Sequence, residues 1–180
     1  MTKESFIQAA KAIADSKTAY LYGGTGEKIT ESVINAKVAQ YPKWYTAVRI
    51  KKLKGCIGYR GFDCSGLIKG IFKDAKEPMK DLNADSIFST MCIKESKPEA
   101  GYLAHKKGHI AIVIDSDHII EASSSAGKVK ISDISSAYEF GRFTLLKDEN
   151  GSVSTGSDVN RLQEIIANLQ AIIEKYGGKK

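Results

Sequence analysis

The first third of the chain places its hydrophobic residues at helical spacing in two segments. Residues 3–16 have the apolar stripe of an amphipathic helix, made by Phe6, Ile7, Ala10, Ile13 and Ala14. Paired glycines in "YGGTGEK" then indicate a turn. Residues 30–40 resume the helical spacing, and Pro42 ends that segment. The basic stretch that follows, up to Gly61, has no regular pattern and is predicted to be irregular.

The pattern changes from helical to strand-like in the second half of the chain. A helix is predicted from Ser65 onward, because four apolar residues fall on one face: Leu67, Ile68, Ile71 and Phe72. The later segments "GHIAIVID", "HIIEAS", "GKVKISDI" and "FGRFTLL" are rich in β-branched and aromatic residues and are bounded by Gly, Asp and Ser. This order predicts an α+β domain over residues 1–147, with N-terminal helices packed on a small antiparallel sheet.

The C-terminal part of the chain reads as a separate unit. Residues 148–157 form a polar, Gly- and Ser-rich linker. Residues 158–180 predict an amphipathic helix whose stripe is made by Val159, Leu162, Ile166, Leu169, Ile173 and Tyr176. Since fewer than three heptads are short for a stable coiled coil, two interpretations stay open. The helix either docks on its own domain, or it mediates self-association or attachment.

Composition narrows the class of protein. Hydrophobic residues make up 42% of the chain and charged residues 27%, values of a soluble globular protein rather than a disordered one. The longest apolar run, Ile110 to Ile114, is too short to span a membrane. Residues 1–17 lack the unbroken apolar core of a secretory signal, so we expect synthesis in the cytoplasm without a signal peptide.

The net charge of +6 favours an anionic partner, such as an acidic cell wall. Solubility alone is the competing explanation. Basic residues are densest from Arg49 to Lys54, but no zinc-finger spacing or RNA-binding signature accompanies them, so no nucleic-acid partner is expected.

Three cysteines, Cys56, Cys64 and Cys92, are an odd number at irregular spacings. The spacing argues against a disulfide framework and against a CxxC metal site, so neither a metal nor another cofactor is expected. Cys64 stands directly before the helix predicted from residue 65, where backbone N–H groups stabilise a thiolate. Cys56 and Cys92 have no such position and are predicted to be structural thiols. A lone cysteine is more often inert than catalytic, so Cys64 needs a partner.

The best candidate for a base is His109, which opens an apolar strand after a glycine in "KKGHIAIVID". An imidazole there can project from the sheet edge toward a helix N-terminus. The alternative is a strand-end histidine satisfied by backbone groups. The other histidines, His105 and His118, fall in charged segments and are predicted to face solvent.

A histidine base also needs a group that holds its tautomer. Glu121, in "HIIEAS", becomes a cross-strand neighbour of His109 if the two strands form a hairpin through "DSDH". Asp115 and Asp117 compete for this role, but they fall in the turn and are expected to point away. Glu121 is therefore the preferred acid.

Four segments of the chain, in order, resemble the motifs of the NlpC-type (NlpC/p-sixty) family of cysteine peptidases, which are papain-like hydrolases of bacterial cell-wall peptides. They are "AYLYGGTG", "GFDCSGLIKGIF", "PEAGYLAHKKGHIAIVID" and "HIIEASSSAGKVKISDI", between about residues 19 and 135. The combination of a "DCSG" helix start with "GHxxI" is specific, whereas "DCSG" alone is weak. The resemblance implies a papain-like fold.

The resemblance also implies roles for single residues. Cys64 would be the nucleophile and His109 the base. Tyr20 matches the family's tyrosine beside the nucleophile, which assists the oxyanion site, and Tyr22 is the fallback. The motif residues that flank the nucleophile are Asp63 and Ser65.

The chain departs from the family pattern at two places. The third catalytic position is most often histidine in the family, and here it is Glu121. Residues 26–60 form a basic insertion between the first two motifs, where compact members of the family have far fewer residues. With Trp44, Tyr45 and Tyr59 it either borders the substrate groove or is a surface elaboration.

Together these features predict a peptidoglycan hydrolase that cleaves an amide bond of the stem peptide, between D-glutamate and the diamino acid, with a Cys-His-Glu triad. We expect it to act at the bacterial cell wall as a phage-type endolysin, a tail-associated lysin or an injected effector. An N-acetylmuramoyl-L-alanine amidase or an acyltransferase is the nearest alternative. A cell-wall-binding or assembly module without catalysis is the alternative from another class.

Overall fold

The fold is described from a computed structural model, which describes residues 1–147 and Ile166. The predicted linker at 148–157 and the predicted helix at 158–180 lie outside the described residues, apart from Ile166. Among the helices of the described part, none is long and apolar enough to cross a membrane.

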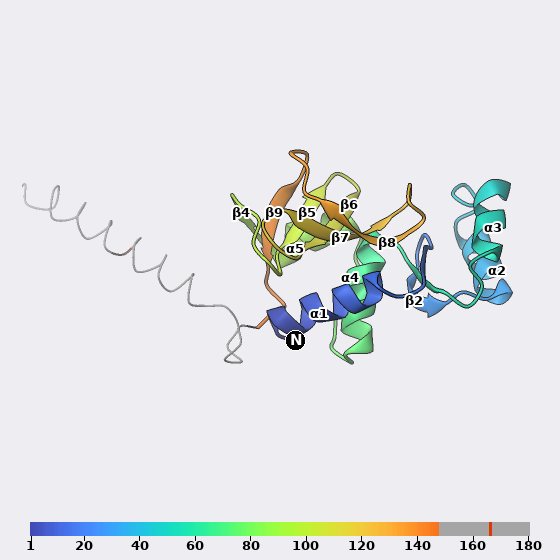
Figure 1. Cartoon of the computed structure of the whole chain (residues 1–180), viewed down its shortest axis with the longest axis horizontal. Coiled ribbons are helices and arrows are strands. Elements are labelled where there is room, and N and C mark those ends of the chain that lie inside the picture. Colours follow the sequence, from blue (N-terminus) through green and yellow to red (C-terminus); the bar gives the residue numbers. More distant parts are fainter. Residues whose placement is uncertain (148–165, 167–180) are drawn as a thin grey trace, which may run out of the picture.

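A six-stranded antiparallel sheet organises the domain (Figure 1). Its strand order is β4-β9-β5-β6-β7-β8. The strands are β4 (Cys92–Glu95), β5 (Leu103–Lys106), β6 (His109–Val113), β7 (His118–Ser123), β8 (Lys128–Asp133) and β9 (Glu139–Phe143). The four predicted strands correspond to β6–β9, whereas β4 and β5 were not predicted. The predicted α+β class with an antiparallel sheet is confirmed.

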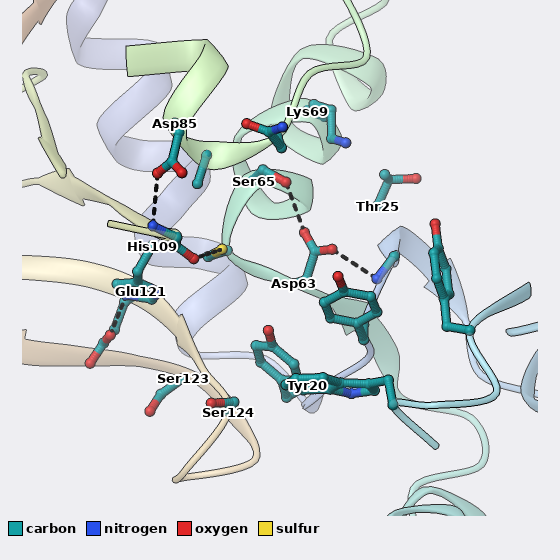
Figure 2. A pocket seen from close by; sticks show the side chains of 18 of the residues that line it. Tyr20, Thr25, Asp63, Ser65, Lys69, Asp85, His109, Glu121, Ser123 and Ser124 are labelled. Atoms are coloured by element: carbon teal, nitrogen blue, oxygen red, sulfur yellow. Dashed lines mark hydrogen bonds and ion pairs between the residues drawn. The ribbon is translucent and has the colours of Figure 1, made fainter. Parts of the chain in front are cut away.

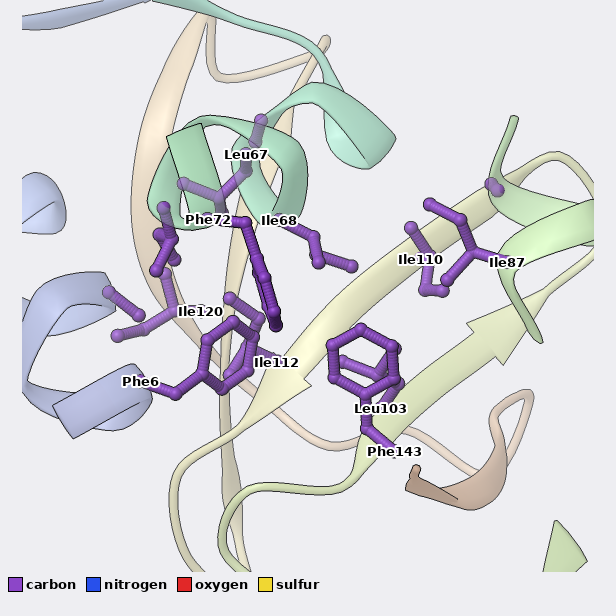
Figure 3. Packing of buried hydrophobic residues seen from close by; sticks show 14 of the residues in the cluster. Phe6, Leu67, Ile68, Phe72, Ile87, Leu103, Ile110, Ile112, Ile120 and Phe143 are labelled. Carbon is purple, nitrogen blue, oxygen red and sulfur yellow. The ribbon is translucent and has the colours of Figure 1, made fainter. Parts of the chain in front are cut away.

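Three helices cover one face of this sheet and bury the main core (Figures 1 and 3). They are α1 (Lys3–Ala14), α4 (Cys64–Asp74) and α5 (Ala84–Met91). The core includes the residues from which two of these helices were predicted, among them Phe6, Leu67, Ile68, Ile71 and Phe72. Burial of each such side chain contributes about 1.5–3 kcal/mol. This packing fixes α4, and therefore residue 64, relative to β6 and β7.

A second, three-stranded sheet joins the N-terminal segments to the start of α4. It contains β1 (Thr18–Tyr20), β2 (Thr25–Lys28) and β3 (Arg60–Phe62). The central strand β3 pairs in parallel with β1 and antiparallel with β2. Because β3 runs directly into α4, this sheet places the tyrosine- and glycine-rich segment after β1 beside the N-terminus of α4.

Residues 26–60 build two further helices, α2 (Glu31–Gln40) and α3 (Ala47–Lys54), at the end of the molecule away from β4 (Figure 1). They pack over a small second core of Ala19, Leu21, Ile29, Ile34, Tyr45 and Leu53. The prediction that the basic stretch up to Gly61 is irregular is therefore wrong for α3. This helix buries only Leu53, so it has no apolar stripe in the sequence, and its N-cap, Thr46, is the main local signal.

Each of the five helices within residues 1–147 begins after a side chain that accepts a hydrogen bond from the backbone N–H three residues later. These N-caps are Thr2, Thr30, Thr46, Asp63 and Asn83. Such a cap contributes about 1 kcal/mol to helix stability. At α4 the cap is a carboxylate, and it also organises the candidate active site.

Candidate active site

The N-terminus of α4 carries Cys64 as its first residue. Asp63 Oδ1 accepts hydrogen bonds from Gly66 N (2.6 Å) and Ser65 Oγ (3.2 Å). Its other oxygen, Oδ2, accepts from Gly23 N at 2.8 Å. Asp63 therefore caps the helix and, with the same carboxylate, holds the glycine turn next to Cys64 (Figure 2).

The glycine turn and the helix start are in direct contact. Asp63 N donates to Gly24 O at 3.1 Å. A Cβ atom on Gly66 would lie 1.8 Å from the same Gly24 oxygen. Since no side chain fits there, the "YGG" and "DCSG" segments pack backbone to backbone, which explains a glycine at position 66 inside a helix.

His109 and Glu121 form a hydrogen-bonded pair, with 2.8 Å between Nε2 and Oε2 (Figure 2). They come from β6 and β7, which form the predicted hairpin. Ile112 lies opposite Ile120, and continuing this register places Glu121 diagonal to His109 rather than directly across from it. The other oxygen of Glu121 accepts from Ser132 Oγ at 2.7 Å, so the carboxylate is held in place from both sides.

The environment favours a charged imidazole paired with a charged carboxylate. Burial lowers the pKa of His109, but hydrogen bonds to Cys64 and Glu121, together with their charges, raise it to about 9. The hydrogen bond from His109 lowers the pKa of Glu121 to about 2; burial acts in the opposite direction, and the bond from Ser132 assists. At neutral pH the pair is therefore an imidazolium and a carboxylate.

Cys64 lies at the other side of the imidazole. Its Sγ lies 4.0 Å from the carbonyl oxygen of Gly108, so it contacts the residue directly before His109. Nε2 of His109 is hydrogen-bonded to Glu121, so Nδ1 is the ring nitrogen that interacts with the thiol. The arrangement thus brings a thiol, an imidazole and a carboxylate together in series.

Both candidate tyrosines line the same cleft, but in different surroundings. Burial raises the pKa of Tyr20, and the charges of Cys64 and Asp63 add to this effect, so the phenol stays protonated and can donate. Tyr22 instead stacks on Trp44, with 4.4 Å between ring centroids. These contacts leave Tyr20 as the better hydrogen-bond donor toward an oxygen near Cys64.

The cleft has a volume of about 880 Å³, and all seven candidate residues line it: Tyr20, Tyr22, Asp63, Cys64, Ser65, His109 and Glu121. The 26–60 insertion contributes part of its wall, with Lys37, Gln40, Tyr41 and Trp44. Tyr45 is buried underneath and donates through its hydroxyl to Tyr22 O at 2.7 Å. Tyr59 lies elsewhere, under the Lys17 ammonium group.

The prediction that His105 faces solvent is wrong. His105 lies on β5 within the sheet and is 8% exposed. Its ring stacks on Phe88, with 4.5 Å between centroids, and its nitrogens lie 2.8 Å from Glu139 Oε1 and 2.8 Å from Asp85 Oδ1. Of the two lysines that suggested exposure, Lys106 ends β5 and Lys107 begins the β5–β6 turn, so the turn starts two residues after His105. His118 is half-exposed and contacts Asp115.

Asp85, at the start of α5, was not found from the sequence, yet it connects this second histidine to the cleft. Asp85 Oδ1, the oxygen that lies 2.8 Å from His105 Nε2, also accepts a hydrogen bond from Gly108 N at 2.7 Å. Asp85 and the thiol of Cys64 thus bind opposite sides of the residue that precedes His109 (Figure 2). The only sequence signal is an aspartate in the first turn after an Asn cap, which is common on surface helices.

The other two cysteines differ from Cys64 in their surroundings. Burial raises the pKa of Cys92 to about 12, and it also raises the pKa of Cys56. Both are free thiols, and this environment suits structural residues. Within residues 1–147 and Ile166, no group of three or more His, Cys, Asp or Glu side chains is placed to hold a metal ion.

Comparisons with known proteins identify the family and the fold of the chain. Residues 17–147 match the sequence profile of the NlpC/P60 family. Among solved structures, the chain is similar to the peptidoglycan hydrolase RipB from Mycobacterium tuberculosis, with 21% identity, a TM-score of 0.52 and coverage of 78% of this chain and 63% of that one. It is also similar to the P60 domain of an antigen from M. avium subspecies paratuberculosis, with 21% identity, a TM-score of 0.50 and coverage of 78% and 96%.

The chain thus spans less than two thirds of the RipB structure. Comparison with curated protein sequences finds no match. At these identities the two structures support the fold, and the family profile supports membership.

Proposed function

Since the chain belongs to the NlpC/P60 family, we propose that it is a cysteine hydrolase of peptidoglycan that cleaves an amide bond in the stem peptide. The observation that carries the proposal is the series Cys64, His109 and Glu121 along one cleft, with the thiol at a helix N-terminus. A thiolate beside an imidazolium is a nucleophile at neutral pH, where a serine in the same place would need a base at each turnover.

In the first step the Cys64 thiolate attacks the carbonyl carbon of the scissile amide, and the carbonyl oxygen takes up the electron pair. The negative charge develops at the N-terminus of α4, where the backbone N–H of Cys64 can donate to it. The protonated Tyr20 hydroxyl is the second donor. The tetrahedral intermediate is stabilised more than the flat substrate, which is what lowers the barrier.

Collapse of the intermediate breaks the C–N bond, and His109 gives its proton to the leaving amine. The neutral imidazole then removes a proton from water, which attacks the thioester and releases the acid and the Cys64 thiolate. Glu121 stays charged throughout; it holds the ring through Nε2 and stabilises the imidazolium form that precedes each proton transfer to the amine.

The bond we favour is the one between D-glutamate and the diamino acid. The same residues can also serve an N-acetylmuramoyl-L-alanine amidase, or an acyltransferase in which an amine replaces water. The cell wall is the proposed site of action, and the net charge of +6 suits an anionic wall. Release as a phage-type endolysin, carriage on a phage tail and injection as an effector are the delivery routes we propose to test.

Product analysis separates these reactions. Purified peptidoglycan is incubated with the full chain, and the released fragments and new termini are identified by mass spectrometry. An endopeptidase exposes a new amino group on the diamino acid, an amidase frees the stem from the sugar, and an acyltransferase adds mass to the acyl fragment. A wall-binding module without catalysis would leave the fragment pattern unchanged while it sediments with the wall.

A further inference from the structure

A second groove, of about 760 Å³, adjoins the catalytic cleft. The two cavities share four lining residues: Tyr20, Trp44, Ser124 and Ser125. Figure 2 shows Tyr20 and Ser124 at the end of the cleft away from Asp85. A substrate that extends past this end therefore reaches residues that also line the second groove.

The walls of this groove come from α3 and from the β7–β8 turn, residues 124–127. The α3 side offers both charge and apolar surface, with Val48, Arg49, Lys52 and Leu53. Val48 is 66% exposed, more than any other large hydrophobic residue that the structure describes. The turn side offers the hydroxyl groups of Ser124 and Ser125. We call this cavity the basic groove.

The charged side chains that line the basic groove are all positive. Arg49 and Lys52 line it, and no acidic residue does. Within residues 1–147, neither cation forms an ion pair with a carboxylate, whereas the nearby Lys54 lies 4.0 Å from Glu31. Arg49 is also fixed: its guanidinium lies 4.0 Å above the Trp44 ring and donates to Trp44 O at 2.7 Å. A fixed guanidinium loses little freedom when it binds an anion.

The helix dipole offers a plainer reason for basic residues near the C-terminus of α3, because cations there stabilise the helix. That reason applies equally to Lys51, Lys52 and Lys54, which all lie in its last turn. It does not explain why an arginine of the first turn stacks on a tryptophan that lines both cavities, or why Val48 stays exposed beside it.

We propose that the basic groove binds a carboxylate-bearing extension of the same peptidoglycan strand whose amide bond lies at Cys64. The proposal rests on the hydrolase function above and names a specificity site for it. The four lining residues that the two cavities share favour a covalently attached extension over a separate molecule. A guanidinium and an ammonium are the groups that recognise a carboxylate, and the apolar side chains of α3 suit its aliphatic part.

The test compares Lys52→Glu with Lys51→Glu, neighbours on α3 that undergo the same charge reversal but differ in whether they line the groove. Each variant and the wild type digest three substrates: a minimal peptide that fills only the catalytic cleft, a longer strand fragment with a carboxylate beyond it, and that fragment with the carboxylate amidated. Inorganic phosphate and the fragment's free carboxylate portion serve as competitors.

We expect Lys52→Glu to raise KM for the carboxylate fragment about tenfold, with kcat unchanged, because the groove contributes binding rather than transition-state stabilisation. Lys51→Glu, the minimal peptide and the amidated fragment should each show little change. Equal effects of both variants, or equal effects on all three substrates, would overturn the proposal. Competition by phosphate but not by the carboxylate portion would also overturn it, since the anion would then belong to another polymer. If the wild type cleaves none of the substrates, the hydrolase function itself is wrong.

Discussion

The pairing of Glu121 with His109 makes a prediction about pH that a purely structural carboxylate does not. Glu121→Gln keeps the size of the side chain and its contact with Ser132, but removes the negative charge 2.8 Å from His109 Nε2. The pKa of His109 is raised to about 9 in part by that hydrogen bond and charge. Cys64 supplies the remaining stabilisation and is not altered.

The expected change in the pKa of His109 can be derived from the contacts of its ring. Loss of an opposite charge at hydrogen-bond distance moves a pKa by about 1 to 3 pH units. Since Cys64 continues to favour the imidazolium, we expect the pKa of His109 to fall by about one pH unit, which corresponds to ~1.4 kcal/mol. The alkaline limb of kcat/KM reports loss of the imidazolium in the free enzyme, so it should lie near pH 9 in the wild type and near pH 8 in the variant.

The free energy of unfolding should be lower for Glu121→Gln than for the wild type, because both pKa shifts stabilise the folded state. A raised pKa of His109 stabilises the fold below pH 6.5, and this is lost as pH rises toward 9. A lowered pKa of Glu121 stabilises above pH 4.5, and this is lost as pH falls toward 2. The difference between wild type and variant should therefore be largest between about pH 4.5 and 6.5.

The assay is a pH series of kcat/KM on purified peptidoglycan fragments, with urea unfolding at the same pH values. Asp115→Asn is the matched control, since it removes a carboxylate from the same hairpin but one that contacts His118. An alkaline limb that stays in place in Glu121→Gln, or one that moves equally in the control, refutes the account of how His109 is held charged.

Four further predictions concern three single residues and the C-terminal segment. Gly66→Ala should lower the unfolding free energy by about 2 kcal/mol or more in urea titrations, because overpacking against Gly24 O outweighs the higher helix propensity of alanine; a stabilised variant would contradict the backbone contact. Tyr20→Phe should lower kcat about 100-fold with KM nearly constant, the effect of losing one oxyanion donor; a change confined to KM would assign the hydroxyl to ground-state binding. Asp85→Asn should lower kcat/KM about tenfold by loosening the Gly108 peptide, and crystallographic placement of residue 108 would show whether it has moved. Removal of residues 158–180 should lower the sedimenting mass if that predicted helix self-associates, and an unchanged oligomeric mass would exclude that role.

The parts of the fold that the sequence predicts are those with strong local periodicity. The helices at residues 3–16 and from Ser65 bury one continuous face, and the hairpin of β6 and β7 buries Ile110, Ile112 and Ile120. Each of these segments carries its own core pattern. Family resemblance then places Cys64 and His109 in one site, which periodicity alone does not do.

The parts that were missed depend on contacts between distant segments. His105 lies between Asp85 and Glu139, which are 20 and 34 residues away, and nothing local marks it as buried. The helix α3 packs mainly through Leu53, so its sequence is largely charged and lacks the apolar periodicity that would predict a helix. The role of Gly66 is likewise invisible until Gly24 is placed against it.

The central claim is that Cys64 is the nucleophile, and the most direct test is the release of new amino groups from purified peptidoglycan by wild type, Cys64→Ala and Cys92→Ala. Cys92 is the matched control, because it is a free thiol that lines neither the catalytic cleft nor the basic groove. We predict amino-group release at wild-type rates by Cys92→Ala and at the background rate by Cys64→Ala, with both variants folded by circular dichroism. Amino-group release by Cys64→Ala near the wild-type rate would contradict the account.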